Sequence, residues 1–201
     1  MRTEQLSAEE KESLITKSID EGIEVKRSLH SLAPEMGKFS DMIIEALRNG
    51  NKILVCGNGG SAADAQHFAA EFVVKFKRER KHLPAIALTT DSSIMTAIIN
   101  DFSGEEIYSR QVEALGNEGD VLVGISTSGK AKNVRNALIS ARERGLKTIA
   151  LTSTSPLGEE FASLADLGIA ISSHTTARIQ EAHITILHIV MELVDKELFN
   201  L

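Results

Sequence analysis

The chain has 201 residues, with 22 Lys and Arg against 28 Asp and Glu, so its formal net charge is −6. An apolar fraction of 42% with 25% charged residues is ordinary globular composition, which excludes a disordered or fibrous chain, and the length allows a full hydrophobic core. The apolar runs are far shorter than the roughly 18 residues that span a bilayer, and the polar N-terminus does not resemble a signal peptide.

A single cysteine, Cys56, leaves no partner for an internal disulfide, which is typical of a reducing compartment. The acidic balance argues against broad nucleic-acid binding. We therefore expect a cytoplasmic protein with neither a membrane nor a nucleic acid as its partner.

Residues 1–50 are predicted to form a helical arm. Apolar side chains recur near the helical period between Leu14 and Leu32, Pro34 interrupts the run, and a second amphipathic stripe covers 39–47. Such an arm would expose an apolar face unless something packs on it. Oligomerisation is the economical explanation, and docking on the chain's own core is the alternative.

Short apolar runs, most of them β-branched, follow the arm and predict buried strands. They lie at 53–56, 85–88, 121–125, 148–151 and 167–171. Helical stretches separate or follow them at 61–78, 92–99, 105–116, 131–144, 156–165 and 176–198. This alternation is typical of a parallel sheet covered by helices, so we predict one α/β domain over residues 1–201.

Two strands run directly into loops suited to a phosphate. The first predicted strand leads into Gly57-Asn58-Gly59-Gly60-Ser61 ahead of a helix, and glycines there let backbone N–H groups approach an anion at the helix N-terminus. A tight strand-to-helix turn with a polar cap is the alternative reading. The third strand leads into Ser126-Thr127-Ser128-Gly129-Lys130, whose hydroxyls suit a sugar phosphate or a simple helix cap. Both loops follow strand carboxyl ends, where open α/β sheets bind ligands.

Acid–base candidates lie on two of the predicted helices. His67 and Glu71 are four residues apart, so they share one helix face and could address the same molecule or metal ion. On the last helix, His188 sits among apolar residues, where a core role is the alternative. Gln180 and His188 are separated by about 12 Å on an ideal helix, at the limit for sharing one metal within a chain. The remaining histidines, at positions 30, 82, 174 and 183, are expected to have no catalytic role.

Four segments together resemble one family. They are CGNGGSAADAQHFAAEF at 56–72, NDF at 100–102, GDVLVGISTSG at 119–129 and ARIQEAHITILH at 177–188. In order and spacing they resemble the sugar isomerase (SIS) domain family, and more narrowly its bacterial phosphoheptose isomerases. The resemblance covers nearly the whole chain from about residue 40.

The resemblance implies a three-layer α/β sandwich with a five-stranded parallel sheet, assembled as a homotetramer with sites shared between subunits. It implies an aldose–ketose isomerase that interconverts D-sedoheptulose 7-phosphate and D-glycero-D-manno-heptose 7-phosphate by proton transfer through an ene-diol. That reaction would be the first step towards ADP-heptose and the lipopolysaccharide core.

The resemblance also implies the site residues. Glu71 and His188 would be catalytic. The substrate would be bound by Asn58, Gly59, Gly60, Ser61, Glu71, Asn100, Asp101, Ser126, Thr127, Ser128 and Gln180. One Zn²⁺ per subunit would be held by His67, Glu71, Gln180 and His188, a donor set of two imidazoles, a carboxylate and an amide oxygen.

The chain departs from the commoner family pattern at a few positions. Lys130-Ala131 stands where Asn-Ser is usual, Lys75 replaces an arginine, and Ala177 replaces an aspartate. These changes affect the expected phosphate and sugar contacts and leave the expected reaction class unchanged.

A binding protein is the main alternative reading. A replication-initiator-associating relative has the same fold and tetrameric habit, and the segment 172–183 is similar to it. That relative lacks the glutamate and the final histidine, whereas Glu71 and His188 are both present here. A regulatory sugar-phosphate sensor is a third reading, although such regulators usually carry an additional DNA-binding domain.

Overall fold

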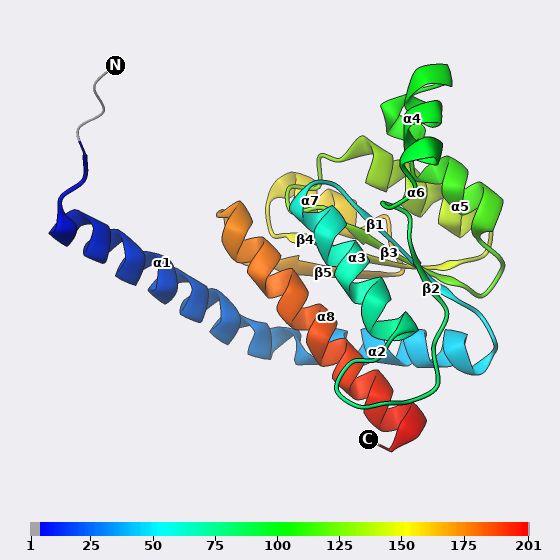
Figure 1. Ribbon diagram of the computed structural model, residues 1–201, viewed down its shortest axis with the longest axis horizontal. Helices are drawn as coiled ribbons and strands as arrows, with labels where there is room; N and C mark the ends of the chain where they lie inside the picture. Colours follow the sequence, from blue (N-terminus) through cyan, green and yellow to red (C-terminus); the bar gives the residue numbers. More distant parts are fainter. Residues whose placement is uncertain (1–4, 201) are drawn as a thin grey trace.

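The structure is a computed structural model that describes residues 5–200, and it is a parallel α/β sandwich (Figure 1). The helices are α1 (Ala8–Ser28), α2 (Ala33–Arg48), α3 (Gly60–Val73), α4 (Ser92–Asp101), α5 (Ser109–Leu115), α6 (Lys132–Glu143), α7 (Pro156–Ala162) and α8 (Thr176–Phe199), with 3₁₀ turns at Leu29–Leu32 and Gly104–Glu106. The strands are β1 (Ile53–Gly57), β2 (Ala85–Ala87), β3 (Val121–Ile125), β4 (Lys147–Ser153) and β5 (Leu167–Ile171). The predicted fold class and five-stranded parallel sheet are confirmed.

The strand order explains why two loops far apart in the sequence become neighbours. The order is β2-β1-β3-β4-β5, and every pair is parallel. The chain therefore leaves β1 towards one edge and leaves β3 towards the other. At the ends of these two central strands, Gly57 pairs with Ile125. The loops after β1 and β3 thus flank the switch point of the sheet, where open α/β sheets bind ligands.

Successive side chains of a strand point to opposite faces of the sheet and pack in two separate apolar layers. Ile53 and Val55 of β1 pack in the layer formed with α2, α3 and α8. Leu54 and Cys56, from the same strand, pack in the layer formed with α5, α6 and α7. Figure 1 shows α3 and α8 running side by side across one face of the sheet. This arrangement brings the helix after β1 and the final helix into contact along their lengths.

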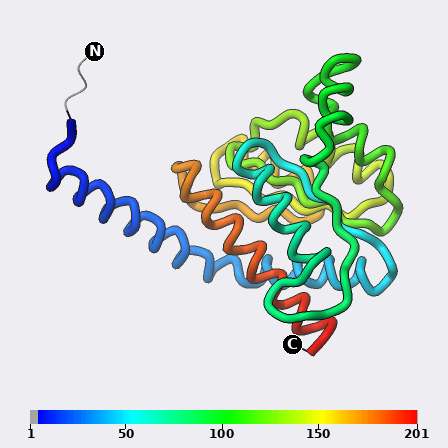
Figure 2. Tube along the Cα trace, viewed as in Figure 1, coloured from blue at the N-terminus to red at the C-terminus, as the bar shows by residue number. Residues whose placement is uncertain are grey.

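The first helix projects from this sandwich and contacts it at the start of α8, where Arg178 donates a hydrogen bond to the Ser18 carbonyl oxygen. In the tube view, α1 extends from the body as a projecting arm (Figure 2). No residue of α1 is buried, and Leu14, Ile15, Ile19 and Ile23 are 42% to 59% exposed. Pro34 lies in the first turn of α2, where its missing N–H costs nothing, so it begins the second helix of the arm. The N-terminal helical region is as predicted, apart from residues 1–4, which lie outside the described part.

Several predicted boundaries were wrong. The helix expected over 61–78 ends at Val73, because the chain turns back and Arg80 donates hydrogen bonds to its last carbonyls. The helix expected over 105–116 splits into a 3₁₀ turn and α5. Over residues 5–200, no helix is both long and apolar enough to span a bilayer.

Candidate active site

The glycine loop after β1 is held by hydrogen bonds from side chains of other elements. Gly59 has φ +57°, a conformation that favours glycine, and α3 begins at the next residue without a side-chain cap. The Tyr108 hydroxyl donates to the carbonyl oxygen of Gly57 at 2.6 Å and lies 3.1 Å from Asn58 Oδ1. The Asn58 amide also exchanges hydrogen bonds with Asn133 at 2.8 and 3.1 Å. The loop is therefore fixed in place, with an uncapped helix N-terminus behind it.

The serine loop after β3 forms one wall of a cavity of about 360 Å³. Gly129 has φ +69°, and a Cβ there would lie 2.1 Å from the Leu157 carbonyl oxygen, so only glycine fits. Residues with hydroxyl groups at or just after the carboxyl ends of β3, β4 and β5 line the cavity: Thr127, Ser128, Ser153, Ser155, Ser173 and Thr176. Ser126 lies at the base of its loop and is buried. Lys130 and His174 also line the cavity, which gives it the character of an anion site.

His67, Glu71 and His188 converge between α3 and α8. The Nε2 atoms of the two histidines are 2.9 Å apart, and His67 Nε2 lies 3.0 Å from Glu71 Oε1. One ligand atom from each residue falls within 4.8 Å of the others. The predicted pairing of His67 with Glu71 on one helix face is confirmed. His188 joins them from α8, 121 residues beyond His67, so two helices that are distant in sequence build one cluster.

The surroundings of His188 favour its neutral form. Partial burial and the nearby His67 lower the pKa of His188, while Glu71 acts in the opposite direction. Because two ring nitrogens face each other at hydrogen-bond distance, one must carry a lone pair. Asp64, one turn before His67, has its pKa raised by burial, with His67 opposing that shift. Sequence reasoning missed Asp64, although its three-residue spacing from His67 places it on the same helix face.

The donor set fits a zinc ion. Two imidazoles and a carboxylate are common zinc ligands, and ligand atoms on tetrahedral zinc, with bonds of about 2.0–2.1 Å, lie about 3.3 Å apart. The separations of 2.9 and 3.0 Å in the cluster are close to that spacing. The structure thus groups three of the four expected ligands.

Gln180, the fourth expected ligand, contacts the glycine loop. A Cβ on Gly60 would lie only 2.3 Å from Gln180 Nε2, so the amide packs directly against the backbone at the start of α3. The amide therefore lies where a ligand held by the glycine loop would meet it. It also explains why residue 60 has no side chain.

Asn100 and Asp101 lie at the C-terminal end of α4 and are exposed. The Asn100 amide donates to Asp101 Oδ1 at 2.7 Å. Among the hydrogen bonds of residues 5–200, none joins this pair to the glycine or serine loop. The structure does not bring these two expected substrate contacts together with the rest of the site.

The class of protein follows from these features: a parallel α/β enzyme with polar loops at its switch point and a His/Glu/His cluster between α3 and α8. The SIS domain profile matches residues 20–153. The chain is 53% identical over 186 residues to the phosphoheptose isomerase of Geobacter sulfurreducens, covering 92% of this chain and 97% of the relative. It is 51% identical over 183 residues to that of Roseiflexus sp., covering 90% and 92%.

Solved structures agree with the sequence relatives. The phosphoheptose isomerase of Neisseria gonorrhoeae superimposes with a TM-score of 0.85 at 42% identity, covering 92% of this chain and 98% of that one. That of Francisella tularensis gives 0.84 at 36% identity, covering 96% and 100%. The chain belongs to the phosphoheptose isomerases of the SIS-domain family and is a sugar-phosphate isomerase.

Proposed function

We propose that this isomerase interconverts D-sedoheptulose 7-phosphate and D-glycero-D-manno-heptose 7-phosphate. The observation that carries the proposal is the cluster of His67, Glu71 and His188 between α3 and α8, the first of which begins at the glycine loop of the switch point. A phosphate held by the hydroxyls of the serine loop would leave the remote end of the sugar free to reach acid–base groups. Aldose–ketose isomerisation needs both a group that anchors the substrate and a group that carries the proton between its carbons.

In the proposed mechanism, Glu71 removes the proton from one of the two carbons C1 and C2 and returns it to the other through an ene-diol. His188, kept neutral by its lowered pKa, moves the accompanying proton between the two oxygens. The glycine loop and Gln180 orient the sugar, and Ser126, Thr127 and Ser128 anchor the phosphate. Asn100 and Asp101 are proposed to contact the sugar once it is bound.

We propose one zinc ion per subunit, held by His67, Glu71 and His188 with the Gln180 amide as fourth ligand. The close approach of three ligand atoms from α3 and α8 supports this. A zinc ion bound there would polarise the substrate oxygens and lower the cost of the negative charge that develops on them.

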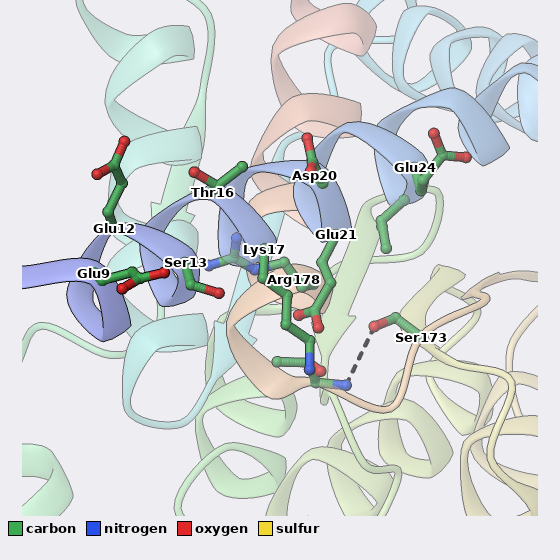
Figure 3. A pocket seen from close by; sticks show the side chains of 12 residues that line it. Glu9, Glu12, Ser13, Thr16, Lys17, Asp20, Glu21, Glu24, Ser173 and Arg178 are labelled. Carbon is green, nitrogen blue, oxygen red and sulfur yellow. Dashed lines mark hydrogen bonds between the residues drawn. The ribbon is translucent and has the colours of Figure 1, made fainter.

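The projecting arm supports a proposed homotetramer with sites shared between subunits. Its exposed apolar side chains leave a surface that a second copy would cover. A hollow of about 840 Å³ lies between α1 and the start of α8 (Figure 3). It is lined mainly by polar side chains, among them Glu9, Glu21 and Arg178, and by none of the candidate site residues. A neighbouring subunit would fill this space.

The product would feed the synthesis of ADP-heptose and the lipopolysaccharide core in the cytoplasm. The alternative, a tetramer that assembles replication initiators without catalysis, has no need for a carboxylate and an imidazole in contact with each other. The presence of both Glu71 and His188 in one cluster favours the enzyme.

The deciding experiment is turnover of sedoheptulose 7-phosphate by metal-stripped protein, with and without added zinc. We expect turnover that zinc restores. Turnover independent of metal would retain the isomerase and remove the zinc site. Absence of turnover in both states would overturn the proposed reaction and favour the initiator-binding alternative.

A further inference from the structure

The segment between α3 and β2 contains one buried arginine, Arg80. Lys77, Arg78 and Lys81 of this segment are exposed, whereas the Arg80 side chain is only 1% exposed. Its partner Asp195, on α8, has a side chain that is 6% exposed. A buried ion pair of this kind needs further hydrogen bonds to offset the loss of hydration.

Those hydrogen bonds go to the end of α3. Arg80 Nη2 donates to the carbonyl oxygen of Glu71 at 2.6 Å, and Nη1 donates to that of Phe72 at 2.8 Å. Nε donates to Asp195 Oδ1 at 2.8 Å. The last carbonyls of a helix lack donors within the helix. The guanidinium therefore caps the turn that carries Glu71 and ties it to α8.

The same segment also contacts the part of α8 that carries His188. Asp195 follows His188 by seven residues, which is about two turns, so both lie on one face of the helix. Phe76 packs on the His188 ring, with 5.7 Å between ring centroids. One short segment thus contacts both α3 and α8 next to their site residues.

The guanidinium group directs two of its nitrogen atoms at the end of α3 and only one at the carboxylate of Asp195. Asp195 Oδ2 is buried and has no hydrogen-bond partner among the described residues, so the pair is not bidentate. The donors that a bidentate pair would use are directed at the two carbonyls. Helix ends fray unless they are capped, and Glu71 lies only two residues before the end of α3.

We infer that Arg80 is a positioning residue, which acts with Asp195 to set the separation of Glu71 from His188. The inference rests on the proposed roles of Glu71 and His188 and extends them to a pair that touches neither substrate nor metal. Removing the guanidinium geometry while keeping its charge should loosen the cluster.

The test is Arg80→Lys, which keeps a positive charge but cannot reach Asp195 and two carbonyls at once. The matched control is Arg48→Lys. Arg48 also pairs with an acid on α8, Glu197, at 2.9 Å, but both side chains are more than half exposed and no end of α3 is involved. Each variant is assayed for kcat and KM on sedoheptulose 7-phosphate and for affinity towards Zn²⁺ alone by chelator competition. The imidazole NMR signals of His67 and His188 are recorded on metal-free protein at fixed pH.

We expect Arg80→Lys to lower kcat and zinc affinity about 10- to 100-fold, the range typical for residues that orient ligands from outside the site. KM should stay within about threefold, and both imidazole signals should shift. Arg48→Lys should change none of these. If Arg80→Lys does not fold, Asp195→Asn, which keeps the shape and one acceptor oxygen, is measured in the same way.

A folded Arg80→Lys or Asp195→Asn protein with a lower melting temperature but wild-type kcat, zinc affinity and imidazole signals would overturn the inference and leave the pair a purely structural role. If the wild-type protein shows no turnover, the proposed function fails separately. The imidazole signals then decide the role of Arg80, because they report the geometry of the cluster without substrate or metal.

Discussion

His67 and His188, separated by 121 positions in the sequence, face each other with their Nε2 atoms 2.9 Å apart. Their rings are tilted by 60°, with centroids 5.0 Å apart, which is not a stacked arrangement. Contact through nitrogen atoms and not ring faces is what a shared proton or a shared metal ion requires. Glu71, on α3 like His67, adds a carboxylate oxygen 3.0 Å from His67 Nε2.

Glu71→Gln should reduce turnover by about 10²- to 10⁴-fold, because the amide cannot accept the substrate proton. The side chain keeps its shape, so the assembly should be unaffected. Steady-state kinetics and light scattering on the same preparation check both expectations. Retained turnover would remove Glu71 as the base.

His188→Gln and His183→Gln should separate catalysis from folding. His188 belongs to the cluster, so its loss should lower kcat about 100-fold with little change in melting temperature. His183 is fully buried, and its Nε2 contacts the Thr152 carbonyl oxygen at 3.1 Å, so its loss should lower stability and largely spare kcat. The reverse order would mean that the wrong face of α8 had been assigned to the site.

His183 should also make stability depend on pH. Burial lowers the pKa of this imidazole to about 4, so the native state holds it neutral while the unfolded chain takes up a proton below its ordinary pKa of about 6.5. Stability should therefore fall as pH drops from about 6.5 towards 4, by about 2 kcal/mol between pH 7 and pH 5. Urea unfolding of wild type and His183→Gln at both values tests this. An equal loss in both proteins would exclude His183 as the cause.

Gly129→Ala should disrupt the serine loop. Its positive φ and the 2.1 Å approach to the Leu157 carbonyl oxygen would force the backbone to move, at a cost of about 2 kcal/mol or more. KM for the sugar phosphate should rise. Gly37→Ala is the control, because nothing lies within 4 Å of its Cβ position in α2 and alanine favours a helix. Thermal melts and KM values should therefore show a lower melting temperature and a higher KM for Gly129→Ala than for Gly37→Ala.

The double variant Ile15→Asp with Ile19→Asp should weaken the assembly. These side chains are 59% and 57% exposed on α1, and burying charge in a subunit interface is unfavourable. Light scattering should report smaller particles, while the circular dichroism of the fold stays unchanged. An unaltered particle mass would show that this face of α1 is not used for assembly.

The strands and most helices could be predicted because their signals are local. Short β-branched runs and a 3.6-residue period depend on neighbouring residues, and they located β3 and β5 with the bounds that the structure has. The end of α3 was wrong because its cap comes from Arg80, which depends on Asp195, 115 residues further along. Local patterns carry no signal for such a contact.

The candidate site was predicted unevenly for the same reason. The spacing of His67 and Glu71 on one helix is a local feature, whereas their meeting with His188 rested on family resemblance. The support that Tyr108 and Asn133 give to the glycine loop was missed. A lone tyrosine and one asparagine in a helix have no pattern that would single them out.

Three polar residues of the last helix, α8, contact other parts of the structure at successive points along its length. Gln180 meets the glycine loop, His188 meets His67, and Asp195 meets Arg80, all from α8. An insertion of one residue between Gln180 and His188 would rotate everything beyond it by about 100° and advance it by about 1.5 Å. The number of residues between these contacts therefore fixes both their separation along α8 and the face of the helix on which they lie. Among related sequences, change within this stretch should occur by substitution and not by insertion or deletion.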